Sequence, residues 1–280
     1  MNERDQHDKR PFDWVTHSNG TYSIRDLEND QAMHSRIGPW EEANRVYAEP
    51  SRPETFLNKS EKLVIHDVGM GTGANAIAAL ERVKSKVEKG SIEIHSFELK
   101  PDGIQFALSD DQNRLPFLST EYRKILGRLL ESKKIDFLLG PLSVSWHLHT
   151  GDYFQHLSEA PPADLIYYDF YSPKVVPELW TEAAFRKVLA HQGSHPTRLF
   201  TYSAATPTRL HLLLAGFFVG EGRSTGIKTE TTIASNSIDY LEAPLKTEWL
   251  KKLETSSSIS GHPEKSRVLT HPQFAEKSKS

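Results

Sequence analysis

Three glycines at alternate positions, Gly69, Gly71 and Gly73, directly follow a short apolar run at 63–65 and precede an Ala-rich stretch at 74–80. The run fits a buried strand, and the Ala-rich stretch favours a helix. Glycines between them let the backbone turn sharply and let a ligand approach closely, because side chains would block both. Strand, glycine turn and helix form the nucleotide-binding start of a doubly wound sheet, although such a turn can also be purely structural.

The spacing of these glycines bears on which nucleotide is bound. The motif reads GxGxG, and Ala74 and Ala76 stand where a dinucleotide fingerprint would have its last glycine. This favours S-adenosylmethionine (SAM) over NAD. Glu98 lies at the end of the second predicted strand, in the segment 91–100, where an acidic residue can accept hydrogen bonds from both ribose hydroxyls of a nucleoside. NAD enzymes and SAM methyltransferases share this device, and an exposed charge at a strand end is the alternative.

An acid, two aromatic residues and a proline follow a third apolar run, at 165–168, in the segment Asp169-Phe170-Tyr171-Ser172-Pro173. Ligands of open α/β sheets bind at the carboxyl ends of the strands. A carboxylate there can orient an amine and attract its positive form, while an aromatic face stabilises the cationic methyl group of SAM or a developing ammonium. The proline would stiffen the wall because its ring fixes φ. The alternative for Asp169 is a helix cap.

Three further segments carry polar chemistry. A predicted strand at 142–148 runs into Asp152, whose carboxylate either meets an adenine amino group or caps the next helix. Residues 104–136 are predicted to be helical and are basic, which usually means a solvated face but here offers the best local contact for phosphates. The segment 31–49 reads either as a lid over a ligand pocket or as a solvated loop and helix. Its polar residues are His34, Ser35, Glu41, Glu42, Arg45 and Tyr47.

The order of these elements predicts an α/β fold of the class I Rossmann-like, SAM-dependent methyltransferase type. We expect a mostly parallel seven-stranded sheet with a C-terminal antiparallel hairpin, 217–219 with 229–234, since that hairpin belongs to SAM methyltransferases and not to NAD domains. A small N-terminal hairpin would turn at Asn19-Gly20 in a type I′ turn. The predicted divisions are residues 1–60 (tail, hairpin and pocket lid), 61–245 (methyltransferase domain) and 246–280 (disordered tail).

Composition limits the partners and the location. The chain has 280 residues, no cysteine and a formal net charge of −3. Without cysteine there is no disulfide, thiolate metal site or cysteine nucleophile, and we expect no metal. The charged N-terminus lacks the apolar segment of a secretory signal, and no window approaches the ~18 apolar residues of a membrane span, so we expect a cytoplasmic protein. The net charge gives no overall attraction to nucleic acid, and an RNA partner would have to meet a local basic patch.

Several segments, taken in order, resemble the methyltransferase domain of the tRNA-modification enzyme MnmC over roughly residues 12–240. They are MHSRIG…EEANRVYAE, DVGMGTGANAIAAL, FELKP, HTGDYFQHL, YYDFYSPKVVPELWTEAAF, TYSAAT…LLLAGF and GRSTGIKTE. That family methylates the aminomethyl group on the wobble uridine of certain tRNAs, with SAM as donor. Val176 stands where the family usually has Asn, a change on the acceptor side.

The motifs and the resemblance together give a set of predicted site residues. Asp169 and Phe170 are predicted to be catalytic, beside the transferred methyl group. SAM binding is assigned to Tyr47, Gly69, Gly71, Gly73, Asn75, Glu98, Asp152 and Asp169. Substrate binding is assigned to Ser35, Glu42, Ser172, Pro173 and Lys228. MnmC has a second, FAD-dependent oxidase domain. No such domain follows here, so the expectation is a stand-alone methyltransferase without FAD.

The predicted function is SAM-dependent N-methylation of the aminomethyl group of 5-aminomethyl-(2-thio)uridine at the tRNA wobble position. A free alkylamine is mostly protonated near neutrality, so the pocket must accept its proton or lower its pKa, and Asp169 is the candidate acceptor. The alternatives are a SAM enzyme acting on another amine, small molecule or protein, an NAD-dependent oxidoreductase, and an inactive protein that keeps the SAM pocket. The oxidoreductase lacks support because no Tyr-x-x-x-Lys pair follows a strand in the required place. The sequence does not define the oligomeric state.

Overall fold

The computed structural model describes residues 11–58, 60–224, 230–257 and 265–274. At its centre is an eight-stranded sheet with the strand order β10-β11-β9-β8-β4-β5-β7-β6. The strands are β4 (Lys62–Val68), β5 (Gly90–Glu98), β6 (Lys134–Leu139), β7 (Leu142–Thr150), β8 (Leu165–Tyr168), β9 (Arg198–Thr201), β10 (Phe218–Gly222) and β11 (Thr231–Ser235). Strands β9, β8, β4, β5 and β7 are parallel, whereas β6 pairs antiparallel with β7, and β11 pairs antiparallel with both β9 and β10.

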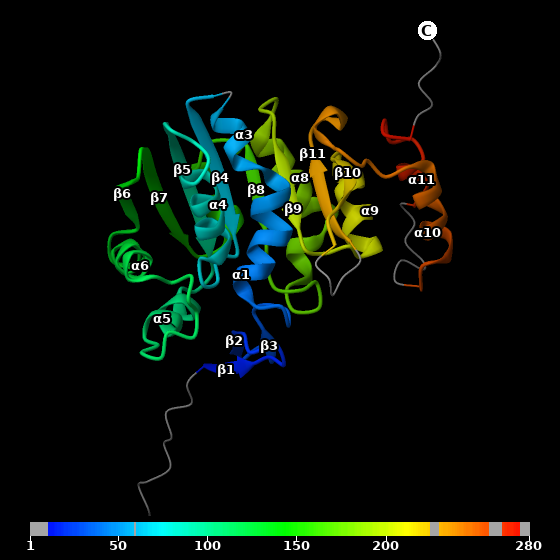
Figure 1. Cartoon of the computed structure of the whole chain (residues 1–280). Helices are drawn as coiled ribbons and strands as arrows, with labels where there is room; N and C mark the ends of the chain where they lie inside the picture. The colour runs from blue at the N-terminus through cyan, green and yellow to red at the C-terminus, as the bar shows by residue number, and fades with distance from the viewer. Residues whose placement is uncertain (1–10, 59, 225–229, 258–264, 275–280) are drawn as a thin grey trace, which may run out of the picture.

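Helices cover both faces of this sheet, and each face has its own apolar core (Figure 1). One face carries α4 (Ala74–Lys84), α6 (Thr120–Ser132) and the succession α1 (Pro39–Glu42), η1 (Ala43–Ala48), α2 (Glu49–Ser51) and α3 (Pro53–Leu57). The other carries α7 (Tyr153–His156), α8 (Glu182–Gln192), α9 (Thr206–Ala215) and α10 (Leu250–Thr255). The remaining helical elements are α5 (Asp102–Leu108), α11 (Lys265–Val268), η2 (Leu157–Glu159), η3 (Pro177–Trp180), η4 (Ile238–Tyr240) and η5 (Thr247–Trp249). Within the described ranges, no helix has the length and apolar character needed to cross a membrane.

Sequence and packing agree in the helices that follow the central strands. Helix α4 is almost entirely buried, which explains why its sequence consists largely of Ala, Ile and Leu rather than an alternation of apolar and polar faces. Helix α8 begins after Thr181, whose hydroxyl accepts a hydrogen bond from the Ala184 amide at 3.2 Å. Helix α9 carries Pro207 in its first turn and ends at Gly216, which has a φ of 104°. These caps fix where the chain returns to the sheet.

A second, three-stranded sheet consists of β1 (Phe12–Thr16), β2 (Tyr22–Asp26) and β3 (Gln31–Ala32). Figure 1 shows this sheet in blue beyond one end of the central strands, below α1. The expected N-terminal hairpin is confirmed, but its type I′ turn is wrong: only Gly20 of the two central residues has positive φ. The Asn19 side chain instead accepts from the Thr21 amide at 3.1 Å, and the loop closes between His17 and Thr21.

The expected parallel sheet with a C-terminal antiparallel hairpin is confirmed, with one strand more than the seven predicted. The additional strand is β6, which occupies part of the region 104–136 that we expected to be helical. Only α5 and α6 in that region are helices; residues 109–119 form a connection, and α6 ends at Lys133, in the left-handed conformation at φ 63°. The sequence of β6 alternates buried Ile135 and Leu139 with exposed Lys134 and Asp136, a period of two that its helix-forming residue types obscured.

The prediction that residues 246–280 are disordered is wrong for the described part of that segment. Trp249, Leu253 and Val268 are buried against the core on the α8–α9 face. Gln273 binds the backbone of β10 through its side-chain amide, which donates to the Val219 carbonyl and accepts from the Val219 amide, both at 2.7 Å. Large apolar side chains and these paired backbone groups hold a segment whose Ser and Lys content suggested a mobile tail.

Candidate active site

The glycine turn joins the ends of two central strands. Gly69, directly after β4, has a φ of 84°, and its amide donates to the Phe97 carbonyl of β5 at 2.9 Å. A Cβ atom at Gly69 would lie 2.5 Å from the Asp169 carbonyl oxygen, so only glycine fits there. Gly73, at φ 78°, is the N-cap of α4. The turn therefore brings the glycine motif and the Asp169 motif into direct backbone contact.

A cavity of about 500 Å³ opens at the carboxyl ends of β4, β5 and β8. This is where the strand order reverses and where ligands of doubly wound sheets bind. Its lining includes eight of the predicted site residues: Ser35, Glu42, Gly69, Gly71, Glu98, Asp152, Asp169 and Phe170. Five others stand outside the lining: Tyr47, Gly73, Asn75, Ser172 and Pro173. Lys228 lies outside the described residues.

Glu98 presents its carboxylate to the cavity at the end of β5. Its Oε2 accepts a hydrogen bond from the Gly71 amide at 2.9 Å, which fixes the side chain against the glycine turn. Burial raises the pKa of Glu98, and the backbone amides that bind it act in the opposite direction. At Gly71 a Cβ atom would meet nothing within 4 Å, so the absence of a side chain leaves space beside this carboxylate. The arrangement offers an acceptor for hydroxyl groups of a bound ligand.

Asp169 lies on the other side of the glycine turn. Its Oδ2 accepts a hydrogen bond from Asn75 Nδ2, in the first turn of α4, at 2.8 Å. Burial, with the negative charge of Glu42 as the second cause, raises the pKa of Asp169 to about 7. The buried hydroxyl of Tyr47 lies close to the same carboxyl, and burial and Asp169 together raise the pKa of Tyr47. A carboxyl that titrates near neutrality can accept a proton from a bound group.

Asn75 and Tyr47 thus act behind the cavity wall rather than in it. Tyr47 belongs to η1, a π-helical segment that interrupts the helical succession 39–57. Such segments are frequent at functional sites. Tyr47 and Asn75 both contact the Asp169 carboxyl, and neither residue lines the cavity.

Aromatic side chains build the wall beside Asp169. Phe170 packs edge-to-face on Tyr153, with ring centroids 5.8 Å apart, and on Tyr168, with centroids 5.0 Å apart. The Tyr202 hydroxyl donates to the Phe170 carbonyl at 3.1 Å. Phe170, Tyr153 and Tyr202 all line the cavity. Their faces suit a cationic group, because the π electrons attract positive charge.

The remaining predicted residues have mostly structural contacts. The Ser35 amide donates to Glu42 Oε2 at 2.7 Å, which orders the segment beside the cavity. Asp152 caps α7 by accepting from the Gln155 amide at 3.1 Å, so the helix-cap alternative is realised while the residue also lines the cavity. The Ser172 hydroxyl donates to Gln31 Oε1 of the N-terminal sheet at 3.5 Å; Gln31 lines the cavity, whereas Ser172 does not.

Comparison with known proteins agrees with this geometry. A family model described as S-adenosyl-L-methionine-dependent methyltransferase matches residues 116–237. The chain is 28% identical over 233 residues to the tRNA 5-methylaminomethyl-2-thiouridine biosynthesis bifunctional protein MnmC of Cupriavidus metallidurans, covering 80% of this chain and 34% of that protein. It is 25% identical over 234 residues to an uncharacterized protein of Methanocaldococcus jannaschii, covering 81% of this chain and 60% of that protein. The crystal structure of MNMC2 from Aquifex aeolicus matches with a TM-score of 0.69 and 25% identity, covering 89% of this chain and 77% of the other.

The chain carries an MnmC-like, SAM-dependent methyltransferase domain. It spans less than two thirds of the length of these two curated relatives. The segment matched by the methyltransferase model contains Asp152, Asp169 and Phe170, whereas the glycine turn and Glu98 precede it.

Several residues that line the cavity were not predicted from the sequence: Met33, Glu178 and Leu179, and Asp26 and Gln31 of the N-terminal sheet. His34, which the sequence placed in the possible lid, lines the cavity as well. Burial lowers the pKa of His34 to about 4, so this imidazole is neutral at physiological pH. The Tyr171 hydroxyl donates to Asp26 Oδ2 at 2.9 Å and so connects the N-terminal sheet to the Asp169 loop. The signal for Tyr202 was its position directly after the apolar strand β9, the same place that Asp169 has after β8.

Proposed function

We propose that this methyltransferase transfers the methyl group of SAM to the aminomethyl group of 5-aminomethyl-(2-thio)uridine at the tRNA wobble position. The proposal depends on one observation above all: Glu98 and Asp169 line the same cavity from the ends of β5 and β8, on either side of the glycine turn. A nucleoside held at Glu98 would direct its reactive end along the turn toward Asp169.

The residues present fit a SAM molecule. Gly71 leaves open space beside Glu98, and the carboxylates of Glu98 and Asp152 suit the ribose hydroxyls and the adenine amino group. When bound, SAM supplies a methyl group made electrophilic by its sulfonium. Phe170 and Tyr202 present aromatic surface to that positive charge.

The role that we assign to Asp169 is to orient the acceptor amine and take its proton. An alkylamine has a pKa close to the ~10.4 of lysine and must lose a proton before it can attack. Asp169, with its pKa raised to about 7 by burial and by Glu42, accepts that proton directly or through water. Alignment of the amine with the methyl group supplies most of the acceleration, since positioning two reactants contributes roughly 7–11 kcal/mol.

The tRNA acceptor is supported by the names of the relatives, four of which are MnmC proteins of tRNA 5-methylaminomethyl-2-thiouridine biosynthesis. Exposed Lys124 and Arg128 on α6 provide basic side chains that could contact phosphates. With a net charge of −3, the chain as a whole does not attract RNA, so binding would depend on such local contacts.

The charge of the cavity lining favours a second candidate, an amine that is not attached to RNA. The lining contains eight acidic residues, Asp26, Glu28, Glu42, Glu98, Asp102, Asp152, Asp169 and Glu178, against one lysine, Lys100. Such a lining attracts a small cationic amine and repels a phosphate backbone near the opening.

One assay separates the two candidates. Purified protein, radiolabelled SAM and total tRNA from cells that lack the final methylation step should give labelled tRNA, and ribonuclease treatment should release the label as mononucleotides. Labelled 5-methylaminomethyl-(2-thio)uridine in the digest supports the tRNA proposal. Transfer only to small amines added in place of tRNA favours the second candidate. No transfer to either, with SAM bound, contradicts both.

A further inference from the structure

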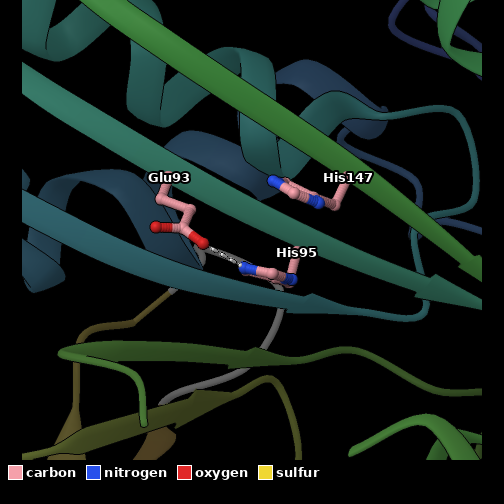
Figure 2. Close-up of side chains that lie close together, drawn as sticks. All are labelled: Glu93, His95 and His147. Atoms are coloured by element: carbon pink, nitrogen blue, oxygen red, sulfur yellow. Dashed lines mark hydrogen bonds and ion pairs between the residues drawn. The ribbon is translucent and has the colours of Figure 1, made fainter. Parts of the chain in front are cut away.

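Histidines gather on the face of β5 and β7 that looks away from the α4–α6 core. In the register of the two parallel strands, His95 lies opposite His147 and Phe97 lies opposite His149. The His95 and His147 rings are stacked, with centroids 4.5 Å apart, and Figure 2 shows His147 over His95 from the neighbouring strand. His156 of α7 and Glu159 of η2 continue this group beyond the end of β7.

A chain of three hydrogen-bond contacts connects two carboxylates through two imidazoles. Glu93 Oε1 lies 2.8 Å from His95 Nε2, the contact drawn in Figure 2. His95 Nδ1 lies 2.9 Å from His149 Nε2, and His149 Nδ1 lies 3.3 Å from Glu159 Oε2. Each contact needs one hydrogen, and the two neutral imidazoles supply only two. One of the three contacts therefore lacks a hydrogen and brings two lone pairs together, unless a further cation, either a proton or a metal ion, is present.

At one end of this chain, His149, His156 and Glu159 place their ligand atoms mutually within 4.8 Å. Neutral imidazoles and a carboxylate are the protonation states that bind transition metals.

We propose that His149, His156 and Glu159 bind a divalent metal ion with the ligand preferences of Zn²⁺. Glu159 already joins the two imidazoles, with Oε1 2.9 Å from His156 Nδ1 and Oε2 3.3 Å from His149 Nδ1. These three ligand atoms lie mutually within 4.8 Å, so side-chain rotations could bring them to the ~2.0–2.2 Å bonds of zinc around one ion. The partial exposure of His156, at 30%, gives the ion access and leaves a position for water.

The contacts behind these ligands match those of established metal sites, in which a ligating imidazole donates its other N–H to a fixed acceptor. With metal on Nδ1, His149 donates from Nε2 to His95 Nδ1, and His95 in turn donates from Nε2 to Glu93. All three contacts of the chain are then satisfied. Phe97 stacks on the His149 ring, with centroids 4.7 Å apart, and holds its orientation.

A second group, Glu93, His95 and His147, also has suitable spacing but is less suited to an ion. Glu93 is paired with Lys62 Nζ at 2.5 Å and accepts the His95 N–H. The planes of His95 and His147 differ by only 16°, so their in-plane lone pairs run side by side instead of converging. Within this group Glu93 and His95 support the proposed site through the hydrogen-bond contact of His95 with His149, whereas His147 has no hydrogen-bond contact with the proposed ligands among the described residues.

The site would tie the end of β7 to α7 across Gly151 and Asp152, which line the SAM cavity. Its function is therefore structural: it would hold the turn that faces the adenine end of the cofactor. This consequence depends on the proposed function, whereas metal binding itself does not.

The test uses the full-length chain without an affinity tag, stripped with chelator and titrated with Zn²⁺ alone by calorimetry. We expect one equivalent bound, at least tenfold weaker binding in His156→Ala and in Glu159→Gln, and unchanged binding in His147→Ala. Both altered ligands are partly or largely exposed, and circular dichroism without metal checks that each variant is folded. Absence of a stoichiometric site in the wild type, equal affinity in all variants, or loss of binding in His147→Ala alone would overturn the proposal.

A second readout separates metal binding from catalysis. Zn²⁺ should raise the melting temperature of the wild type and of His147→Ala but leave His156→Ala unchanged. With Co²⁺ in place of Zn²⁺, visible absorption in the wild type should report nitrogen and oxygen ligands and disappear in Glu159→Gln. Failure of methyl transfer in the same samples would leave these results standing, so the two proposals fail separately.

Discussion

Replacing Asp169 by asparagine should stabilise the protein while removing methyl transfer. The pKa of this carboxyl rises from 3.8 to about 7 on folding, chiefly through burial. About three pKa units at ~1.4 kcal/mol each give an upper bound of about 4 kcal/mol for the cost of the charged form. Asp169 borders the cavity and is partly exposed, so screening reduces the expected gain to roughly 1–2 kcal/mol.

The pH dependence of this gain has a definite sign. Because the folded-state pKa is the higher one, the native state keeps the proton longer than the unfolded chain. Wild-type stability therefore falls as pH rises from about 4 to about 7, and the asparagine variant lacks that loss. The advantage of the variant should be small near pH 4, grow through this window and stay constant above pH 7.

Thermal unfolding of wild type and Asp169→Asn between pH 4 and 9 measures this difference in stability. We expect the melting temperature of the variant to be roughly 2–8 °C higher than that of the wild type at pH 8. Calorimetry with SAM and a methyl-transfer assay accompany it, and we expect SAM affinity within about tenfold of wild type with turnover reduced by at least ~100-fold. Asp111→Asn, at an exposed position, is the matched control and should change neither quantity. A variant with normal turnover, or one whose relative stability is independent of pH, would refute the reasoning.

Three further substitutions test other parts of the structure. Glu98→Gln removes a charged hydrogen-bond acceptor from the cavity and should weaken SAM about 10- to 100-fold by calorimetry; an unchanged affinity would rule out ribose binding there. Gly69→Ala places a Cβ atom 2.5 Å from the Asp169 carbonyl oxygen and should cost at least ~2 kcal/mol in urea unfolding, so wild-type stability in this variant would contradict the close approach. Gln273→Ala leaves the Val219 amide without its acceptor, while the Val219 carbonyl keeps the Leu245 amide as donor, and should cost about 1–3 kcal/mol in the same experiment; a neutral result would show that Gln273 adds nothing to the fold.

Local patterns were enough to predict the sheet and the centre of the candidate site. Gly69, Glu98 and Asp169 each follow a short apolar run, and the carboxyl ends of parallel strands meet at one edge. Strand β6 was not predicted, because its Lys and Leu residues favour helices and its alternation is only six residues long. The C-terminal segment was wrongly predicted because its composition is polar. Val268 is buried only through packing against residues that are far away in the sequence.

Residues that depend on strand register or on packing could not be read from spacing. Tyr202 reaches the cavity because β9 pairs with β8, and Tyr153 because α7 packs its ring on Phe97 and Phe170. The imidazole chain has the same origin, since His95 and His149 are 54 positions apart and meet only through the pairing of β5 with β7. The expectation of no metal followed from the absence of cysteine and did not consider histidines on neighbouring strands.

The most direct test of the central claim is a crystal structure of the protein with S-adenosylhomocysteine, the product of methyl transfer. The account predicts the ribose hydroxyls on the Glu98 carboxylate and the sulfur atom facing the Asp169 side chain, inside the cavity that both residues line. A ribose bound away from Glu98, or a sulfur atom directed out of the cavity away from Asp169, would contradict it.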